Sequence, residues 1–417
     1  MNPKMFERTR RTAGRAIAVG VVTLALVACG GGGSGTAATT AAAPTAAATV
    51  PAPSPTPAPT PASAATPATG VATFLNLDLT RLANYAAPTL PAYYDGAVTA
   101  RDNTPASDPV SDRLATLGRV LFHDRRLSVN DTVSCASCHQ PPTGFSDPQR
   151  FSIGFNGSSF TSAHSMRLGN LRYWTPGSMF WDRRAATLEA QATQPIQHPV
   201  EMGFDAANGG LAALLSKMNG LSYYPELFQF AFGDTAITEA RIQRALAHFQ
   251  RAMVSTGSRW DTAYATVFTP NAPNRALNVN LPGFSAEENR GRQLFMNAPN
   301  QGGAGCARCH EPPAFALDAN SRSNGLDAGE ARLFKSPSLK SVALGGPYMH
   351  DGRFATLAQV IEHYDSGVQP GPALENRLRG GPLNLSAADK AALVAFLRTL
   401  DDTALTQDAK FSNPFLR

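Results

Sequence analysis

Apolar residues recur with the period of an α-helix at several places along the chain. The clearest runs are residues 114–121, residues 242–253 and residues 391–400, the last of which follows the helix-start signal Ser386 with Asp389. Spacings of three and four residues put these side chains on one helical face, whereas alternating, strand-like runs are absent from the sequence. The pattern predicts a mainly α-helical fold.

The sequence also contains a second helix-start signal and two long stretches without helical periodicity. Ser285 followed by Glu288 has the spacing of a capping box and opens a further predicted helix. Residues 140–175 and 311–347 are rich in Gly, Pro and Ser and show no periodic pattern. We expect these two stretches to gain their order from packing rather than from secondary structure of their own.

The first 70 residues differ from the rest of the chain. Residues 1–28 contain five basic residues, followed by the apolar run Ala16–Ala28. This run is short for a membrane span and has the length typical of a signal sequence. The run ends at Cys29 in a segment that resembles a bacterial lipobox, so Cys29 is the predicted lipid anchor; an ordinary secretory signal is the alternative. Residues 29–70 are Ala/Thr/Pro-rich and predict an extended tether.

These features predict a location on the periplasmic side of a bacterial envelope, with attachment to the outer membrane through Cys29. The net charge agrees with export rather than with nucleic-acid binding. Residues 1–28 hold five basic residues and one acidic residue, so +4 of the formal +5 belongs to the signal segment. The remaining charge of about +1 gives no electrostatic basis for binding nucleic acid.

Four of the five cysteines lie in two copies of Cys-x-x-Cys-His, at 135–139 and 306–310. A Gly-Arg-x-Leu-Phe segment precedes each copy, at 118–122 and 291–295, and a Pro-Pro tail follows each. The repeat predicts a duplicated module. We place the boundary between an N-terminal domain, 71–280, and a C-terminal domain, 281–417.

The motif itself indicates attachment of c-type haem. Thiols three positions apart on one turn can form thioethers with both vinyl groups, and the next residue presents an imidazole to the iron. Cys135, Cys138, Cys306 and Cys309 are therefore the predicted attachment residues, with His139 and His310 as proximal iron ligands. A zinc site is the alternative, but it would have to join cysteine pairs 171 residues apart and would leave both histidines unexplained.

Residues 180–202 resemble the bacterial di-haem cytochrome c peroxidase and MauG family. They read Phe-Trp-Asp-Arg-Arg-Ala-Ala, then Leu-Glu-Ala-Gln, and later Pro-Ile-Gln and Pro-Val-Glu-Met. The resemblance extends to 122–128 before the first motif and to 336–340 and 347–352 in the second half. It implies two cytochrome c-like haem domains related by duplication, with long loops packed on two covalently bound haem c groups.

In this family the N-terminal haem reacts with peroxide and the C-terminal haem supplies electrons. The resemblance implies that Glu201 is the distal acid or base, that Gln191 is a polar partner in the same pocket, and that Trp181 is a relay between the haems. A carboxylate suits proton transfer in O–O cleavage, and partial burial would raise its pKa usefully. The alternative to these roles is that Glu201 is a solvated turn residue and that Trp181 is a side chain of the hydrophobic core.

The chain departs from the plain peroxidases at two iron ligands. Phe155 stands where many of them carry a loop histidine, which implies an open first haem; His164, nearby, is an alternative ligand. Tyr364 stands where the peroxidases carry the methionine ligand of the second haem, as in MauG-like proteins. Met349 and His363 are the alternatives, and Tyr364 could instead be part of a core helix face.

The family often holds a calcium ion between its domains, which is an open expectation for this chain. Gly345 and Pro347 match the carbonyl positions of that site, but the block that carries its asparagine reads His-Ser-Met-Arg at 164–167. The resemblance therefore leaves calcium in doubt.

The preferred hypothesis is a MauG-like di-haem peroxidase or oxidase that acts on hydrogen peroxide. Its electrons would come from a protein partner, which could be a small cytochrome, a cupredoxin or a protein substrate. The alternatives are a detoxifying peroxidase with a soluble cytochrome donor and a non-catalytic di-haem electron carrier.

Overall fold

The computed structural model describes residues 70–175, 177–317, 322–335 and 337–416. All of them belong to one unit of the chain, residues 65–417. The predicted signal segment, Cys29 and the tether up to residue 69 lie outside the described residues. Within those residues, no helix has the length and apolar character needed to cross a lipid bilayer.

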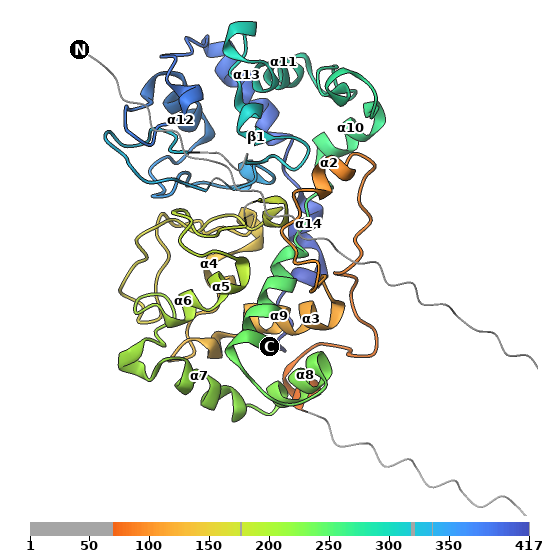
Figure 1. Cartoon of the computed structure of the whole chain (residues 1–417), viewed down its shortest axis with the longest axis vertical. Helices are drawn as coiled ribbons and strands as arrows, with labels where there is room; N and C mark the ends of the chain where they lie inside the picture. The colour runs from red at the N-terminus through yellow and green to blue at the C-terminus, as the bar shows by residue number, and fades with distance from the viewer. Residues whose placement is uncertain (1–69, 176, 318–321, 336, 417) are drawn as a thin grey trace, which may run out of the picture. The chain divides into compact units, whose positions relative to one another are not determined.

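Helices dominate the described chain, as the sequence predicts (Figure 1). The longer helices are α3 (Asp112–His123), α7 (Gly210–Asn219), α8 (Tyr223–Phe232), α9 (Glu239–Arg251), α10 (Arg259–Val267), α11 (Ala286–Met296) and α13 (Ala387–Arg398). The shorter ones are α1 (Gly70–Phe74), α2 (Gly96–Thr99), α4 (Cys135–Cys138), α5 (Leu188–Ala192), α6 (Gln194–Gln197), α12 (Leu357–Glu362) and α14 (Thr403–Gln407). Strands β1 (His310–Glu311) and β2 (Ala316–Leu317) pair antiparallel.

Single turns make up most of the remaining elements. The 3₁₀ turns are η1 (Arg125–Leu127), η2 (Pro141–Thr143), η3 (Leu171–Tyr173), η4 (Ala206–Asn208), η5 (Pro273–Ala276), η6 (Pro299–Gln301), η7 (Cys306–Arg308), η8 (Val342–Leu344), η10 (Asn376–Leu378) and η11 (Ala409–Phe411). A π-helical turn, η9 (His363–Gly367), continues α12 directly. The described parts of the two long Gly/Pro/Ser-rich stretches contain only such turns, isolated β-bridges and the short β1–β2 pair.

The predicted helix starts are found where the sequence places them. Ser285 and Glu288 form a reciprocal capping box at the start of α11. The side chain of Ser386 accepts a hydrogen bond from the Asp389 backbone N–H at the start of α13. These caps satisfy backbone donors that a helix end leaves without partners.

Two close helix pairs organise the fold: α3 with α9, and α11 with α13 (Figure 1). The two helices of each pair meet at the glycine of a Gly-Arg-x-Leu-Phe segment. A Cβ atom on Gly118 would collide with the Ala245 carbonyl in α9, and one on Gly291 would collide with the Ala392 carbonyl in α13. The glycines therefore allow each pair of backbones to approach more closely than any side chain would permit.

Replacing Gly291 by alanine is expected to destabilise the fold by about 3 kcal/mol, the upper part of the usual range for overpacking. The obstacle is a backbone carbonyl, which cannot move aside by changing rotamer. Gly96→Ala is the matched control because open space surrounds that position. Urea unfolding should show a clear loss for the first variant alone; equal stability of the two variants would contradict this packing.

Two hydrophobic clusters fill the interior around these pairs. The first gathers buried residues of α3, α8 and α9, including Leu121, Phe228 and Phe249. The second gathers residues of α10, α11 and α13, including Trp260 and Phe396. The Cys135 side chain packs against the first cluster and the Cys306 side chain against the second. Cys309, of the second motif, also packs against the first cluster, so the second motif adjoins both clusters.

Candidate functional site

The first cysteine motif occupies one helical turn. Ser134 and Ser137 form a capping box on α4, and the backbone N–H of His139 donates to the Cys135 carbonyl at 2.9 Å. His139 Nδ1 lies 3.0 Å from the carbonyl oxygen of Phe145. That contact suits an Nδ1–H donor and leaves Nε2 as the ring nitrogen able to bind a metal.

The second motif has a similar course. Cys306 opens η7, Cys309 follows it, and His310 begins β1. Burial lowers the pKa of His310 to about 4 and also lowers that of His139. Both imidazoles are therefore neutral at ordinary pH, which is the form that binds iron.

Three of the four cysteine thiols are also kept uncharged. Burial raises the pKa of Cys135 and of Cys306 to about 12, and that of Cys138 to about 11. Zinc binds thiolates, whereas a thioether leaves sulfur neutral, so these surroundings suit haem attachment better. Among the described residues, no cluster of three or more His, Cys, Asp or Glu side chains could hold a metal ion. The zinc alternative therefore has no support.

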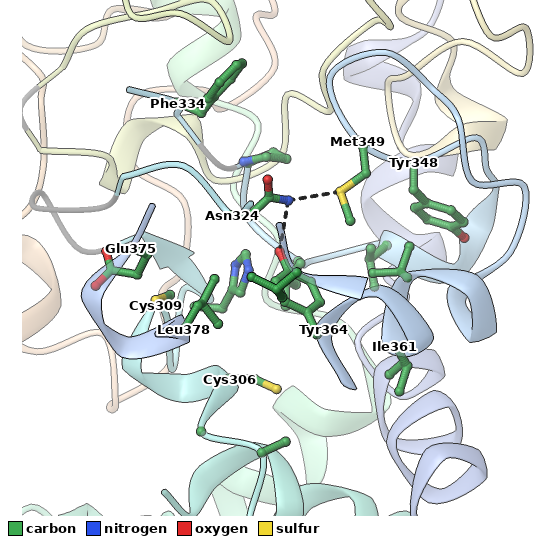
Figure 2. A pocket seen from close by; sticks show the side chains of 18 of the residues that line it. Cys306, Cys309, Asn324, Phe334, Tyr348, Met349, Ile361, Tyr364, Glu375 and Leu378 are labelled. Carbon is green, nitrogen blue, oxygen red and sulfur yellow. Dashed lines mark hydrogen bonds between the residues drawn. The ribbon is translucent and has the colours of Figure 1, made fainter. Parts of the chain in front are cut away.

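A cavity of about 460 Å³ adjoins the second motif (Figure 2). Cys306, Cys309 and His310 line it together with apolar side chains such as Leu357, Ile361 and Leu393. A large, mostly apolar cavity beside two thiols and a neutral imidazole fits a haem group. Those three motif residues would hold it.

Tyr364 and Met349 both line this cavity, and Asn324 connects them (Figure 2). Asn324 Nδ2 lies 3.4 Å from Tyr364 Oη and 3.3 Å from Met349 Sδ. Burial raises the pKa of Tyr364 to about 12, while the Asn324 hydrogen bond acts in the opposite direction. The structure therefore brings both predicted ligands of the second haem to one place.

His363, the third alternative, is not among the residues lining that cavity. Its Nε2 atom lies 3.1 Å from the Asn324 backbone carbonyl, and its ring packs against Phe354. The π-helical turn η9 separates the two neighbours in this way: Tyr364 lines the cavity and His363 packs elsewhere. Such turns are frequent at functional sites.

Glu201 lies in the turn that follows α6, with its side chain 30% exposed. Burial raises its pKa, and the positive charges of His198 and Arg184 oppose that rise. The Glu201 charge in turn raises the pKa of both Cys135 and Cys138. The predicted proton-transfer residue is therefore within electrostatic range of the first motif.

Phe155 packs directly on this turn. Its backbone N–H donates to the Glu201 carbonyl at 3.0 Å, and its ring lies so close to Gly203 that a side chain there would touch it. A phenyl ring has no atom that ligates iron. Gln191 is half-buried on α5, and within the described residues no hydrogen bond joins its side chain to Glu201. Its pairing with Glu201 stays a prediction.

Trp181 lines the cavity of the second motif. Its Nε1–H donates to the His164 carbonyl at 2.7 Å, and its ring meets that of His350 edge-on at 6.4 Å. The sequence reasoning missed His350, although a signal existed. Residues 180–188 and 349–357 share Asp, Arg and Ala-Thr-Leu at equivalent positions, and Trp181 matches His350.

The structure gives these two segments the same local form. Each begins with an isolated antiparallel bridge, Met179 to Ala185 and Tyr348 to Phe354. Each then enters a short helix capped by a threonine: Thr187 for α5 and Thr356 for α12. The Trp181–His350 contact is therefore a meeting of two equivalent turns.

The side chain of His164 and the predicted calcium ligands form other contacts in the structure. His164 Nε2 lies 3.1 Å from Ser146 Oγ, and its Nδ1 lies 3.2 Å from the Arg150 carbonyl, so both ring nitrogens have protein partners. The buried guanidinium of Arg167 donates to the Gly345 carbonyl. Calcium needs six to eight oxygen ligands, and a fixed positive charge on one of them opposes it. These residues do not fit calcium.

Comparison with known proteins agrees with this arrangement. A family model described as di-haem cytochrome c peroxidase matches residues 112–267. Methylamine utilization protein MauG of Methylophilus methylotrophus is 33% identical over 314 residues, which is 72% of this chain and 86% of that protein. Cytochrome c551 peroxidase of Nitrosomonas europaea is 30% identical over 62% of this chain and 74% of its own length.

A solved structure is similar as well. The crystal structure of a MauG-like protein associated with microbial copper homeostasis superposes with a TM-score of 0.62 at 30% sequence identity, covering 79% of this chain and 99% of that one. The sequence resemblance is confirmed, and membership of the family implies haem c cofactors. The chain belongs to the di-haem cytochrome c peroxidase family, which includes MauG, and is an oxidoreductase of the peroxidase type.

Proposed function

We propose that this protein reduces hydrogen peroxide to two molecules of water beside Glu201, in the N-terminal half of the chain. The reaction consumes two electrons and two protons, and the electrons come from a protein donor by way of the C-terminal half. The observation that carries the proposal is the half-buried Glu201 carboxyl, whose charge acts on both thiols of the first motif.

Haem, when bound at both motifs, supplies the iron centres for peroxide reduction at the first site and for electron storage and transfer at the second. Cys135 and Cys138 would form the thioethers of the first group, with His139 as its ligand. At the second, Cys306, Cys309 and His310 would have the same roles, and Tyr364 would be a further ligand of the iron. The similar helix pairs α3–α9 and α11–α13 support a duplication, with domains at 71–280 and 281–417.

Glu201 would accept a proton from the peroxide oxygen nearest to it and return that proton to the leaving oxygen. Its raised pKa keeps the two protonation states closer in energy than in an exposed glutamate, which favours transfer in both directions. Gln191 would orient the peroxide from α5. Phe155 packs on the Glu201 turn and offers no atom to an iron, which supports a site at His139 that is open to peroxide.

Trp181 is the proposed relay side chain between the two sites. It lines the second cavity, and its hydrogen bond to the His164 carbonyl holds the indole ring in one orientation. The location proposed is the periplasmic side of the envelope, with Cys29 as the lipid anchor, because residues 1–29 have the features of a lipoprotein signal. A small cytochrome, a cupredoxin or a protein substrate would be the electron donor.

Electron paramagnetic resonance of the purified ferric protein tests the proposal. We expect one high-spin signal, because Phe155 stands where a histidine ligand would be and has no atom that ligates iron, and one low-spin signal from the second site. Ferric protein mixed with peroxide should react without prior reduction. A spectrum that is wholly low-spin, both before and after half-reduction, would leave only an electron carrier.

A further inference from the structure

The cavity beside Cys306 and His310 has an unbalanced electric charge. Its lining includes five arginine or lysine side chains but a single carboxylate, that of Glu375. Glu375 is already paired, since its Oε1 atom accepts a hydrogen bond from Arg377 Nε at 2.9 Å. The cavity is therefore suited to a ligand that brings negative charge with it.

Lys335 is a deeply buried basic residue of this lining. Its side chain is 3% exposed, and its Nζ atom contacts the thioether sulfur of Met166 at 3.3 Å and faces the Trp174 ring at 5.7 Å. Neither partner carries a formal charge. Within the described residues, no carboxylate lies close enough to form an ion pair with Lys335.

An ammonium group buried in this way is unfavourable unless a counter-charge meets it. Lys340 shows the usual solution in the same fold, because its buried Nζ atom lies 2.5 Å from the carboxylate of Asp261. The backbone of Lys335 is nevertheless fixed: its N–H donates to the Trp181 carbonyl at 2.8 Å. A lysine held beside a cavity, with no oxygen acceptor for its Nζ atom among the described residues, indicates that its acceptor belongs to the ligand.

We propose that Lys335 binds a propionate carboxylate of the haem attached at Cys306 and Cys309. The inference rests on the haem site proposed above for that motif. Haem carries two carboxylates at one edge, so a propionate would supply both the missing acceptor and the missing negative charge. Because Lys335 is hydrogen-bonded to Trp181 through its backbone, the contact would also fix that haem edge relative to the relay residue.

The test compares three variants of the holoprotein: Lys335→Met, Lys335→Arg and, as a control, Lys410→Met. Lys410 does not line the cavity and pairs with Asp408. Haem content is measured first, with two haems per chain expected. Resonance Raman spectroscopy then follows the propionate bending band, and spectroelectrochemistry follows the midpoint potential of the second haem.

Lys335→Met should shift the propionate band and lower the midpoint potential, because a positive charge near the iron favours the reduced state. Lys335→Arg should restore both values towards those of the unmodified protein, and Lys410→Met should change neither. A fully loaded Lys335→Met protein with an unchanged propionate band would overturn the inference, even if the potential moved, because another anion would then be the partner.

Should Lys335→Met fail to load haem, Lys335→Gln offers the same comparison, since glutamine keeps a hydrogen-bond donor and removes the charge. Absence of haem from the unmodified protein would instead refute the proposed function. The two failures are therefore distinguishable.

Discussion

Replacing Glu201 by glutamine is expected to lower kcat/KM for hydrogen peroxide by about 10²- to 10⁴-fold, the usual contribution of a positioned acid or base. Glutamine has nearly the same shape and can still donate a hydrogen bond, but it cannot take a proton from peroxide. Stopped-flow measurement of the reaction of ferric protein with peroxide gives the rate. The haem absorbance spectrum of the variant should be unchanged, because Glu201 is not an attachment residue.

The control for this variant is Glu287→Gln, which removes an exposed carboxylate at the start of α11. The pH dependence adds a second check. Burial favours the protonated form of Glu201 and raises its pKa, so the ionised base is lost at a higher pH than for an exposed glutamate. In the unmodified protein, kcat/KM should therefore fall as the pH drops through this raised pKa. Persistence of that acidic limb in the Glu201→Gln variant would remove Glu201 from the proton-transfer role.

Replacing Tyr364 by methionine is expected to raise the midpoint potential of the second haem by a sizeable fraction of the roughly 0.8 V that axial ligands span. A phenolate is an anionic, hard ligand that favours ferric iron, whereas a thioether is neutral and soft and favours ferrous iron. The cavity can accept the change because Met349 already places a thioether there. Spectroelectrochemical titration of the holoprotein measures the shift.

Met349→Leu is the matched control for the ligand assignment. Both side chains contact the amide of Asn324, so each variant removes one of its two partners. If Tyr364 is the ligand, Met349→Leu should change the potential little. A large shift in the Met349→Leu protein, together with none in Tyr364→Met, would assign the methionine instead.

Local patterns predicted much of this molecule. Helical periodicity located α3, α9 and α13, because each buries one continuous apolar face against a neighbour. The capping spacing of Ser285 and Glu288 located the start of α11, because that interaction is made within four residues. The family resemblance selected Tyr364 and Glu201; Tyr364 lines the cavity of the second motif, and Glu201 lies within electrostatic range of the first motif.

Contacts between distant segments were beyond such reasoning. Asn324 lies 25 residues from Met349 and 40 residues from Tyr364, and only the folded chain brings the three side chains together. The contact of Arg167 with the Gly345 carbonyl spans 178 residues. Local propensity carries no information about such pairs. The sequence did align Trp181 with His350 in two similar segments. Equivalent positions in two similar segments do not by themselves imply that the two rings are in contact.

The π-helical turn at His363–Gly367 has a consequence for how this site can change during evolution. A π turn amounts to one extra residue inserted into a regular helix. A π turn takes about one more residue than an α turn to complete the same rotation, so deleting one residue there would leave the chain on either side in nearly the same position. Loss of the single codon for Tyr364 would thus remove the proposed ligand of the second iron while α12 keeps its place.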